Sequence, residues 1–277
     1  MKKFYEIIFC SVLLLSFGVW LFLLLKEGSA SRQLDIFFRH CADFFADTLN
    51  VVGYSGQRDV YHNMNYTGLG EKAYPPLTYV GTYLLSRLVN MEPYYQANYF
   101  LDMYKEPQFF IVVILFLIIN MILLYEVVRT CKKGTEGVKI FTAFAVLLSA
   151  PGIYSMERGN TILLTVFFVM LFVFYHDSEK AWLKELALIA FAFSIGLKIT
   201  PAVLGVLLLY MKQWKEIGRA VIYTLIVVFV PFLFFKGGFD NIAQMFSNIQ
   251  SNLSNYTSVE GCTLTASIFQ FTGVKED

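Results

Sequence analysis

The sequence contains little charge and few of the residues from which metal or redox sites are built. Only 16% of its 277 residues are charged and 57% are hydrophobic, whereas about a quarter of an average soluble protein is charged. The 22 basic and 21 acidic residues nearly cancel, and the absence of a basic stripe or nucleic-acid motif argues against nucleic-acid binding. The composition therefore predicts an all-α polytopic membrane protein.

Cysteine and histidine are too few and too scattered to form a known motif. The four cysteines, at positions 10, 41, 131 and 262, include no CxxC pair, and the three histidines share no ligand spacing with them. We therefore expect no metal and no cofactor.

The N-terminus predicts a first membrane anchor. Lys2 and Lys3 precede an apolar run over residues 7–25. At about 19 residues this run exceeds the apolar region of a signal peptide, about 7 to 15 residues, and can span the hydrocarbon core. We expect an uncleaved helix whose N-terminus lies in the cytoplasm.

Six further spans are expected, at about 109–128, 140–154, 161–175, 186–197, 200–211 and 221–235. The apolar run over 186–211 is divided because Lys198 and Pro201 lie in its middle. A lysine at the centre of a span costs about 2.5 to 3.5 kcal/mol on insertion scales. Two short helices with a polar tip avoid that cost.

The basic residues predict the orientation of the chain. They cluster in three short connections, at 129–139, 180–184 and 212–219, and only the divided run places all three on the cytoplasmic side with Lys2 and Lys3. The chain is then one membrane domain, 1–277, of the cell inner (plasma) membrane. Four polar features converge on its extracytoplasmic side: a loop over 26–108, the "MERGN" turn at 156–160, the "KITP" tip at 198–201, and the segment 236–277.

The outer loop, about 80 residues long, exceeds an ordinary connection and is expected to carry structure or function. Its stretch "LDIFFRHCADFFADTLNVV" repeats apolar residues at helical spacing, which predicts an amphipathic helix on which Asp43 and Asp47 share one face. A second amphipathic helix is predicted after the double proline of "KAYPPLTYVGTYLL".

Simpler roles exist for most of these polar residues. Asn160 could cap the helix that follows it, Arg158 could extend its charge to the membrane interface, and Arg39 with Asp43 could form a surface pair. Lys198 is harder to explain in this way, because ionisable groups at membrane depth usually mark functional pathways.

Taken together, these motifs resemble glycosyltransferase family 87 over roughly residues 1–240. The similarity lies in their order: "ADFFAD" in the first outer loop, then "VY" and "YPPL", a later "RGN" turn, and an "LKITP" hairpin tip followed by a basic turn. The resemblance implies a GT-C-like transmembrane helix bundle and an enzyme that uses polyprenyl-phosphate sugars. Members of the family commonly continue through more spans, so we expect this chain to be C-terminally incomplete.

The resemblance also implies roles for individual residues. Asp43 matches the first-loop acid and is the expected catalytic base, with Asp47 in reserve; the base takes the proton of the acceptor hydroxyl. The donor phosphate is expected to bind Arg158, Lys198 and Asn160. The acceptor and sugar side is expected to be shaped by Tyr61, Tyr74, Pro75 and Pro76.

The expected reaction is transfer of a mannose-like hexose or pentose, with inversion, from a polyprenyl-phosphate sugar to a lipid- or glycan-linked acceptor. The expected partners are this donor, the acceptor and the bilayer. Two rivals remain: a lipid-linked glycan transporter or flippase, and a non-catalytic envelope-assembly subunit. A transporter would show inverted repeats with broken helices, and "LKITP" is one such break without a visible counterpart.

Overall fold

The computed structural model describes residues 2–27, 45–56, 59–62, 72–92, 103, 105–131 and 134–257. All regular secondary structure in these residues is helical, which confirms the all-α expectation for this part of the chain. The elements are α1 (Lys2–Glu27), α2 (Ala46–Ser55), α3 (Pro76–Ser86), α5 (Pro107–Cys131), α6 (Glu136–Leu147), α7 (Ala150–Glu157), α8 (Ile162–Tyr175), α9 (Ala181–Leu197), the 3-10 helix η6 (Thr200–Gly205), α10 (Val206–Tyr210), α11 (Trp214–Phe229), the 3-10 helices η7 (Val230–Phe234) and η8 (Gly238–Asp240), and α12 (Asn241–Thr257).

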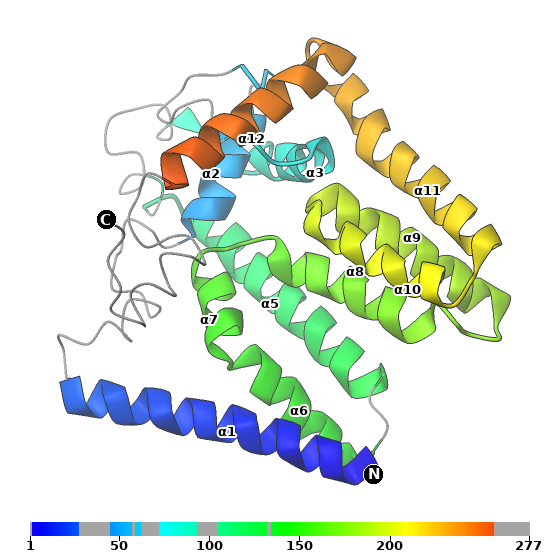
Figure 1. The fold of residues 1–277 in the computed structure, drawn as a ribbon. Helices are drawn as coiled ribbons and strands as arrows, with labels where there is room; N and C mark the ends of the chain where they lie inside the picture. The colour runs from blue at the N-terminus through cyan, green and yellow to red at the C-terminus, as the bar shows by residue number, and fades with distance from the viewer. Residues whose placement is uncertain are drawn as a thin grey trace, which may run out of the picture.

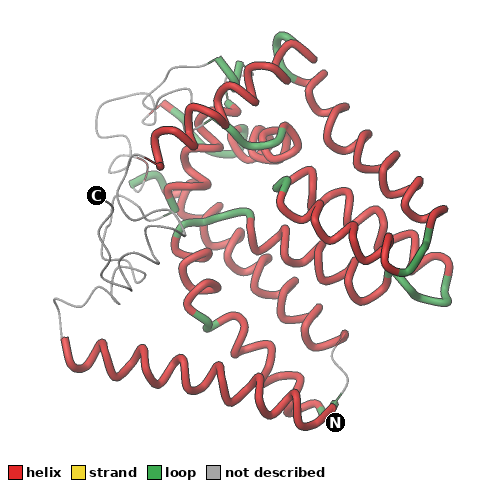
Figure 2. The backbone as a smooth tube through the Cα atoms, in the orientation of Figure 1, coloured by secondary structure: helices red, strands yellow, loops and turns green. Residues whose placement is uncertain are grey.

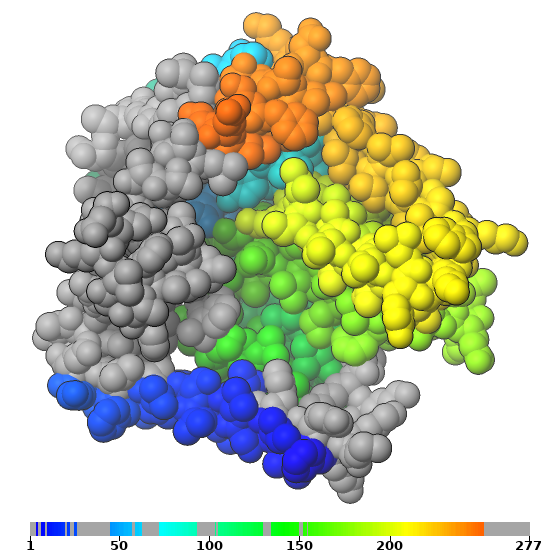
Figure 3. Space-filling model, in the orientation of Figure 1, coloured from blue at the N-terminus to red at the C-terminus, as the bar shows by residue number. Residues whose placement is uncertain are grey.

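The long helices form a bundle with two different ends (Figure 1). Helices α2, α3 and α12 gather at one end, while the connections between α5 and α6, α8 and α9, and α10 and α11 lie at the other. The backbone trace shows short links between most of these helices (Figure 2), and α12 lies over part of α3 in the space-filling view (Figure 3). Helix α1 lies along one edge of the bundle, where it contacts α6.

Two described helical stretches are long and apolar enough to cross a membrane, Pro107–Arg129 and Trp214–Phe234. Both carry large hydrophobic side chains on their surface, such as Ile111 and Leu115 on α5 and Ile226 on α11. Shorter apolar helices include Ile162–Tyr175 and Thr200–Tyr210. Contiguous apolar surface of this kind requires contact with lipid or protein.

The apolar segment expected at 140–154 is interrupted, because α6 ends at Leu147 and α7 begins at Ala150. The hydroxyl of Ser149 accepts a hydrogen bond from the backbone N–H of Gly152 at 3.3 Å, the geometry of a serine N-cap. Proline is favoured in the first turn of a helix, where Pro151 lies. The "SAPG" sequence therefore starts a new helix inside the apolar run.

The break expected between 197 and 200 is present. Lys198 is extended, with φ −146° and ψ 133°, and this conformation ends α9. The chain resumes as the 3-10 helix η6, which has Pro201 in its first turn, and becomes α-helical only at Val206. Helix α9 begins at Ala181, before the expected residue 186, and α12 was not predicted.

An aromatic core joins the long loop to the rest of the bundle. The buried ring of Tyr61 makes an edge-to-face contact with Tyr79 of α3 at 5.4 Å and stacks on Phe232 of η7 at 5.7 Å. The side-chain amide of Asn248 in α12 donates to the carbonyls of Tyr61 and Lys72, at 3.0 and 3.1 Å. The loop, η7 and α12 are therefore packed as one unit.

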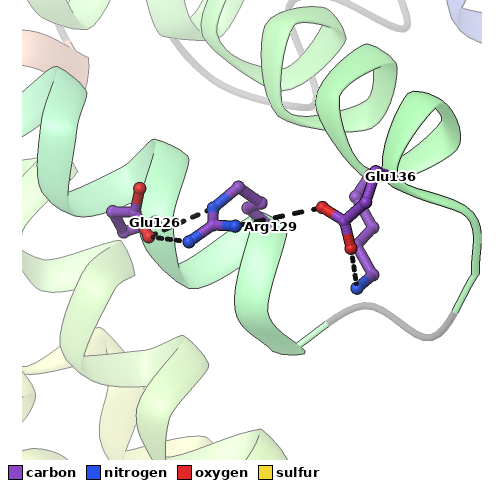
Figure 4. Close-up of polar contacts among 4 residues, drawn as sticks. Glu126, Arg129 and Glu136 are labelled. Atoms are coloured by element: carbon purple, nitrogen blue, oxygen red, sulfur yellow. Dashed lines mark hydrogen bonds and ion pairs between the residues drawn. The ribbon is translucent and has the colours of Figure 1, made fainter.

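A chain of ion pairs connects α5 and α6 at the opposite end (Figure 4). Arg129 contacts Glu126 at 2.8 Å and Glu136 at 3.9 Å, and Glu136 contacts Lys139 at 2.6 Å. The carboxylate of Glu136 is exposed, so water weakens these attractions. These surface ion pairs therefore contribute little to the stability of the fold.

The end of α7 meets the start of α2, in what we call the α2–α7 junction (residues 45–48 and 157–160). The backbone N–H groups of Phe45 and Asp47 donate to the carbonyls of Glu157 at 2.7 Å and Arg158 at 3.1 Å. The hydroxyl of Thr48 donates to the carbonyl of Gly159. Free N–H groups at one helix start thus satisfy free carbonyls at another helix end.

Gly159 makes this junction possible. Its φ of +62° lets α7 end in a Schellman motif, in which the N–H of Asn160 reaches the carbonyl of Ser155 at 2.9 Å. A Cβ atom added at Gly159 would lie 2.8 Å from Phe45 Cγ and from Thr48 Oγ1. The position therefore requires glycine both for its backbone conformation and for the approach of α2.

We predict that Gly159→Ala lowers the free energy of unfolding by about 1 to 3 kcal/mol, because it combines backbone strain with a clash. Thermal unfolding of the purified protein in detergent measures the change. Gly218→Ala in α11 is the control, since a Cβ there meets no atom within 4 Å. Equal unfolding temperatures for the two variants would contradict the role assigned to Gly159.

Candidate functional site

A carboxylate, a guanidinium and an amide meet at the α2–α7 junction. Arg158 donates to Oδ1 of Asp47 through Nε at 3.2 Å and through a terminal nitrogen at 2.7 Å. The side-chain amide of Asn160 donates to the other oxygen, Oδ2. About a fifth of each charged side chain is exposed, 19% for Asp47 and 23% for Arg158. The Asp47 carboxylate is thus held in one orientation while part of it remains open to a ligand.

Asn160 links this cluster to the start of α8. Its side-chain oxygen accepts a hydrogen bond from the backbone N–H of Ile162 at 3.0 Å, while its amide nitrogen contacts Asp47. Asn160 therefore binds a backbone N–H at the start of α8, one residue before the N-cap residue Thr161, and its amide holds Asp47 at the same time.

Lys198 brings a second cation toward the same carboxylate. It follows the last turn of α9, where the Leu197 carbonyl accepts a hydrogen bond from the hydroxyl of Thr78 in α3 at 3.0 Å. Its Nζ lies 5.1 Å from the centre of the Tyr74 ring, a cation–π distance. Burial lowers the pKa of Lys198, and the charge of Asp47 opposes this shift. The two groups are therefore close enough to interact electrostatically.

The double proline follows Tyr74, the residue whose ring contacts Lys198. Pro75 is the N-cap residue of α3 and Pro76 occupies its first turn, positions that tolerate the missing N–H of proline. Both prolines are buried, so they shape the backbone beneath the site rather than its surface.

Tyr61 is a buried residue that binds the backbone of Tyr74. Its hydroxyl donates to the carbonyl of Tyr74 at 3.0 Å, and burial raises its pKa far above the usual value, so it remains a donor. The side chain has no exposed surface. In this geometry Tyr61 positions Tyr74 and offers no surface to a sugar.

The structure brings together most of the residues singled out from the sequence. The loop at 26–108, the "MERGN" turn and the "KITP" tip converge at a cluster of five of these residues: Asp47, Arg158, Asn160, Lys198 and Tyr74. Asp43 lies outside the described residues, so its role as catalytic base stays a prediction. Glu157, the residue before Arg158, is almost fully buried, and its carbonyl accepts the N–H of Phe45.

Two parts of this region had not been singled out from the sequence. Phe45 and Thr48 hold the turn through the backbone and hydroxyl contacts of the junction. Lys72 is fully buried, with Nζ 4.7 Å from the centre of the Tyr54 ring. The sequence did carry a signal for the turn that Phe45 and Thr48 contact. In "MERGN" a glycine follows a charged residue at the end of an apolar run, which is typical of a helix C-cap.

The cluster combines groups that suit chemistry on an anionic substrate. A fixed carboxylate can accept a proton, and an arginine and a lysine can hold a phosphate. No group of three or more His, Cys, Asp or Glu side chains that could hold a metal ion occurs among the described residues.

Comparison with known families identifies the chain. The model of glycosyltransferase family 87 matches residues 73–270, which include the "YPPL", "RGN" and "LKITP" motifs but begin after Asp47. Neither the curated proteins nor the solved structures gave a match. The family match covers well over half of the sequence and carries both cations of the candidate site. The chain therefore belongs to glycosyltransferase family 87, and it is a glycosyltransferase.

Proposed function

We propose that the protein is a polytopic enzyme of the plasma membrane that transfers a mannose-like hexose or pentose from a polyprenyl-phosphate donor. The acceptor is a lipid- or glycan-linked hydroxyl on the extracytoplasmic side, and the anomeric configuration is inverted. The observation that carries this proposal is the contact of Asp47 with Arg158 and Asn160, beside Lys198 and Tyr74. It joins an acid, two cations and an aromatic ring in one place.

The two cations bind the donor phosphate in this proposal. Arg158 reaches it as a planar donor and Lys198 as a point charge. Because Arg158 also contacts Asp47, the phosphate and the carboxylate share the guanidinium. The ring of Tyr74, under the ammonium of Lys198, provides an aromatic face for the sugar.

The reaction needs one base and no added proton donor. The acceptor oxygen attacks the anomeric carbon while the bond from that carbon to the phosphate oxygen breaks. The electron pair leaves with polyprenyl phosphate, which is stable as an anion, and the acceptor proton passes to a carboxylate.

Two carboxylates compete for the role of base. Asp43 has the sequence resemblance in its favour, while Asp47 has the contacts with Arg158 and Asn160 in its favour. An ionised carboxylate has about four acceptor sites. The contacts of Asp47 with these two residues therefore leave capacity for an acceptor hydroxyl. We propose Asp47 as the base on this ground and keep Asp43 as the alternative.

The two ends of the bundle support one membrane orientation. The end of α5 and the start of α6, which carry Arg129 and Lys139, and the basic connections at 180–184 and 212–219 lie opposite α2, α3 and α12 in Figure 1. We propose that this basic end faces the cytoplasm, as the positive-inside rule requires. The Asp47 cluster is then extracytoplasmic.

We predict that Asp47→Asn slows sugar transfer by about 10²- to 10⁴-fold, because an amide cannot take the acceptor proton. Donor binding should persist, since the amide keeps the shape of the carboxylate. Transfer from radiolabelled polyprenyl-phosphate sugars in isolated membranes measures the rate. Asp43→Asn is made in parallel, and loss of transfer in that variant alone would assign the base to Asp43.

We predict that donor affinity is lost as pH rises and that this loss begins at a lower pH than it would for an ordinary lysine, whose pKa is about 10.4. Burial lowers the pKa of Lys198, so the neutral amine, which cannot hold phosphate, forms earlier as pH rises. Lys198→Arg should move this loss of affinity to higher pH. Binding of polyprenyl-phosphate mannose across the alkaline range tests it, with Lys180→Arg as the control; superimposable profiles for all three proteins would exclude Lys198 from the phosphate site.

We predict that a cysteine at Asn90 reacts with a membrane-impermeant maleimide in intact cells and that a cysteine at Glu179 reacts only after permeabilisation. Both positions are exposed. The native cysteines are first replaced by serine. Labelling of residue 179 from outside would reverse or reject the proposed topology.

A further inference from the structure

A groove of about 480 Å³ lies between α11 on one side and α9, η6 and α10 on the other. Helix α11 contributes residues at positions 217, 220, 221, 224 and 225, which recur at the spacing of a single helix face. This face extends over about 12 Å at a rise of about 1.5 Å per residue. The groove is therefore elongated along the helix axis.

Small side chains keep the groove open. Ala202 and Gly205 of η6 and Ala220 of α11 line it together with larger residues such as Phe191 of α9. A Cβ atom added at Gly205 would lie 3.6 Å from the Phe191 ring, an ordinary contact. Larger side chains at these positions would therefore occupy the groove rather than merely border it.

The lining is almost entirely hydrocarbon. Among the described residues that form it, Thr224 alone carries a side chain with a polar atom. A polar ligand would find almost no hydrogen-bond partner there, and burying its polar groups without partners would be unfavourable. The lining therefore favours an apolar occupant, and a hydrocarbon chain fits it.

One end of the groove lies next to the candidate site in sequence and in the fold. Ile195 and Ala202, which line it, precede and follow Lys198 by three and four residues. Lys198 in turn lies over Tyr74 and interacts with the charge of Asp47. A molecule with an anionic head at Lys198 could thus extend an apolar tail along α11.

We propose that this groove binds the polyprenyl chain of the sugar donor. The inference rests on the proposed function and adds the part of the enzyme that recognises the lipid. A polyprenyl phosphate combines in one molecule the two chemistries that lie side by side, a phosphate for Lys198 and an uninterrupted hydrocarbon chain for the groove.

The groove acts mainly through orientation. In a bilayer the chain leaves surroundings that are as apolar as the groove, so burial adds little hydrophobic free energy. A chain held along α11 fixes the direction from which the phosphate, and with it the anomeric carbon, approaches Asp47. Such alignment of reacting atoms is a large part of enzymatic rate enhancement.

Photo-crosslinking of the purified full chain in lipid nanodiscs tests the proposal. The probe is a polyprenyl phosphate without sugar that carries a diazirine near its head, and the labelled peptides are identified by mass spectrometry. Labelling of α9, η6 or α11 at groove residues is the expected result. Because the probe carries no sugar, the measurement does not depend on transfer activity.

Two variants fill the groove, Thr224→Trp and Gly205→Leu, and each should reduce labelling about tenfold, the effect of a 1.4 kcal/mol loss in binding. The matched control is Ile222→Trp, on the same helix but outside the groove and 55% exposed. This control should label like the unchanged protein. Thermal unfolding of each variant shows that it is folded before its labelling is compared.

Three results would overturn the proposal. The first two are labelling that is unchanged in both groove variants and labelling confined to other helices. The third is displacement of the probe by a diacyl phosphatidic acid more readily than by unlabelled polyprenyl phosphate. The last result would assign the groove to an acyl chain. Groove labelling without transfer of any sugar would instead count against the proposed function, so the two failures are distinguishable.

Discussion

The candidate site depends on hydrogen bonds between two helix ends that are far apart in sequence. The start of α2 has backbone N–H groups without partners in its own helix, and the end of α7 has carbonyls in the same condition. Pairing them joins Phe45 and Asp47 to Glu157 and Arg158. This places the side chain of Asp47 against those of Arg158 and Asn160, so the polar cluster follows from backbone hydrogen bonding.

Burial around the junction gives these bonds their rigidity. Phe45 is fully buried, adopts a left-handed conformation with φ 57°, and makes an edge-to-face contact with Phe116 of α5 at 5.3 Å. A nonglycine residue in this region is strained and persists only where its surroundings hold it. The aromatic core around Tyr61 and Tyr79 anchors the same loop on its other side. Helix α2 is therefore fixed from both sides.

The sequence predicted the parts of this arrangement that depend on composition and local signals. Low charge and long apolar runs indicated helices, and Lys198 with Pro201 indicated the break after α9. Counting basic residues predicted that the loop, the turn, the tip and the C-terminal segment share one side of the membrane, and the structure brings the first three together around Asp47. The Ser149 cap was not predicted, because it lies within a run whose average hydrophobicity is that of one continuous helix. A serine shortly before a proline is nevertheless a known signal for a helix start.

What the sequence could not predict are contacts between residues far apart along the chain. The sequence pattern alone treats Asp43 and Asp47 as equivalent positions of one predicted helix, and the preference for Asp47 arises from contacts with Arg158 and Asn160, more than 100 residues away. The groove is equally invisible in the sequence, because Gly205 and Ala220 become significant only when η6 and α11 face each other. Local patterns specify helices, whereas packing selects which side chains meet.

The separation of Asp47 from Arg158 by 111 residues also has a consequence for biogenesis. At about 5 to 20 residues per second, synthesis needs roughly 5 to 20 seconds to reach the partner after Asp47 has been made. During that interval α5, including the Phe116 ring that Phe45 contacts, has already been made, but the α7 carbonyls that accept from Phe45 and Asp47 have not. The helices up to α7 must therefore be made and inserted before α2 can dock on the end of α7. The candidate site forms only after both of its parts, which are far apart in sequence, are present.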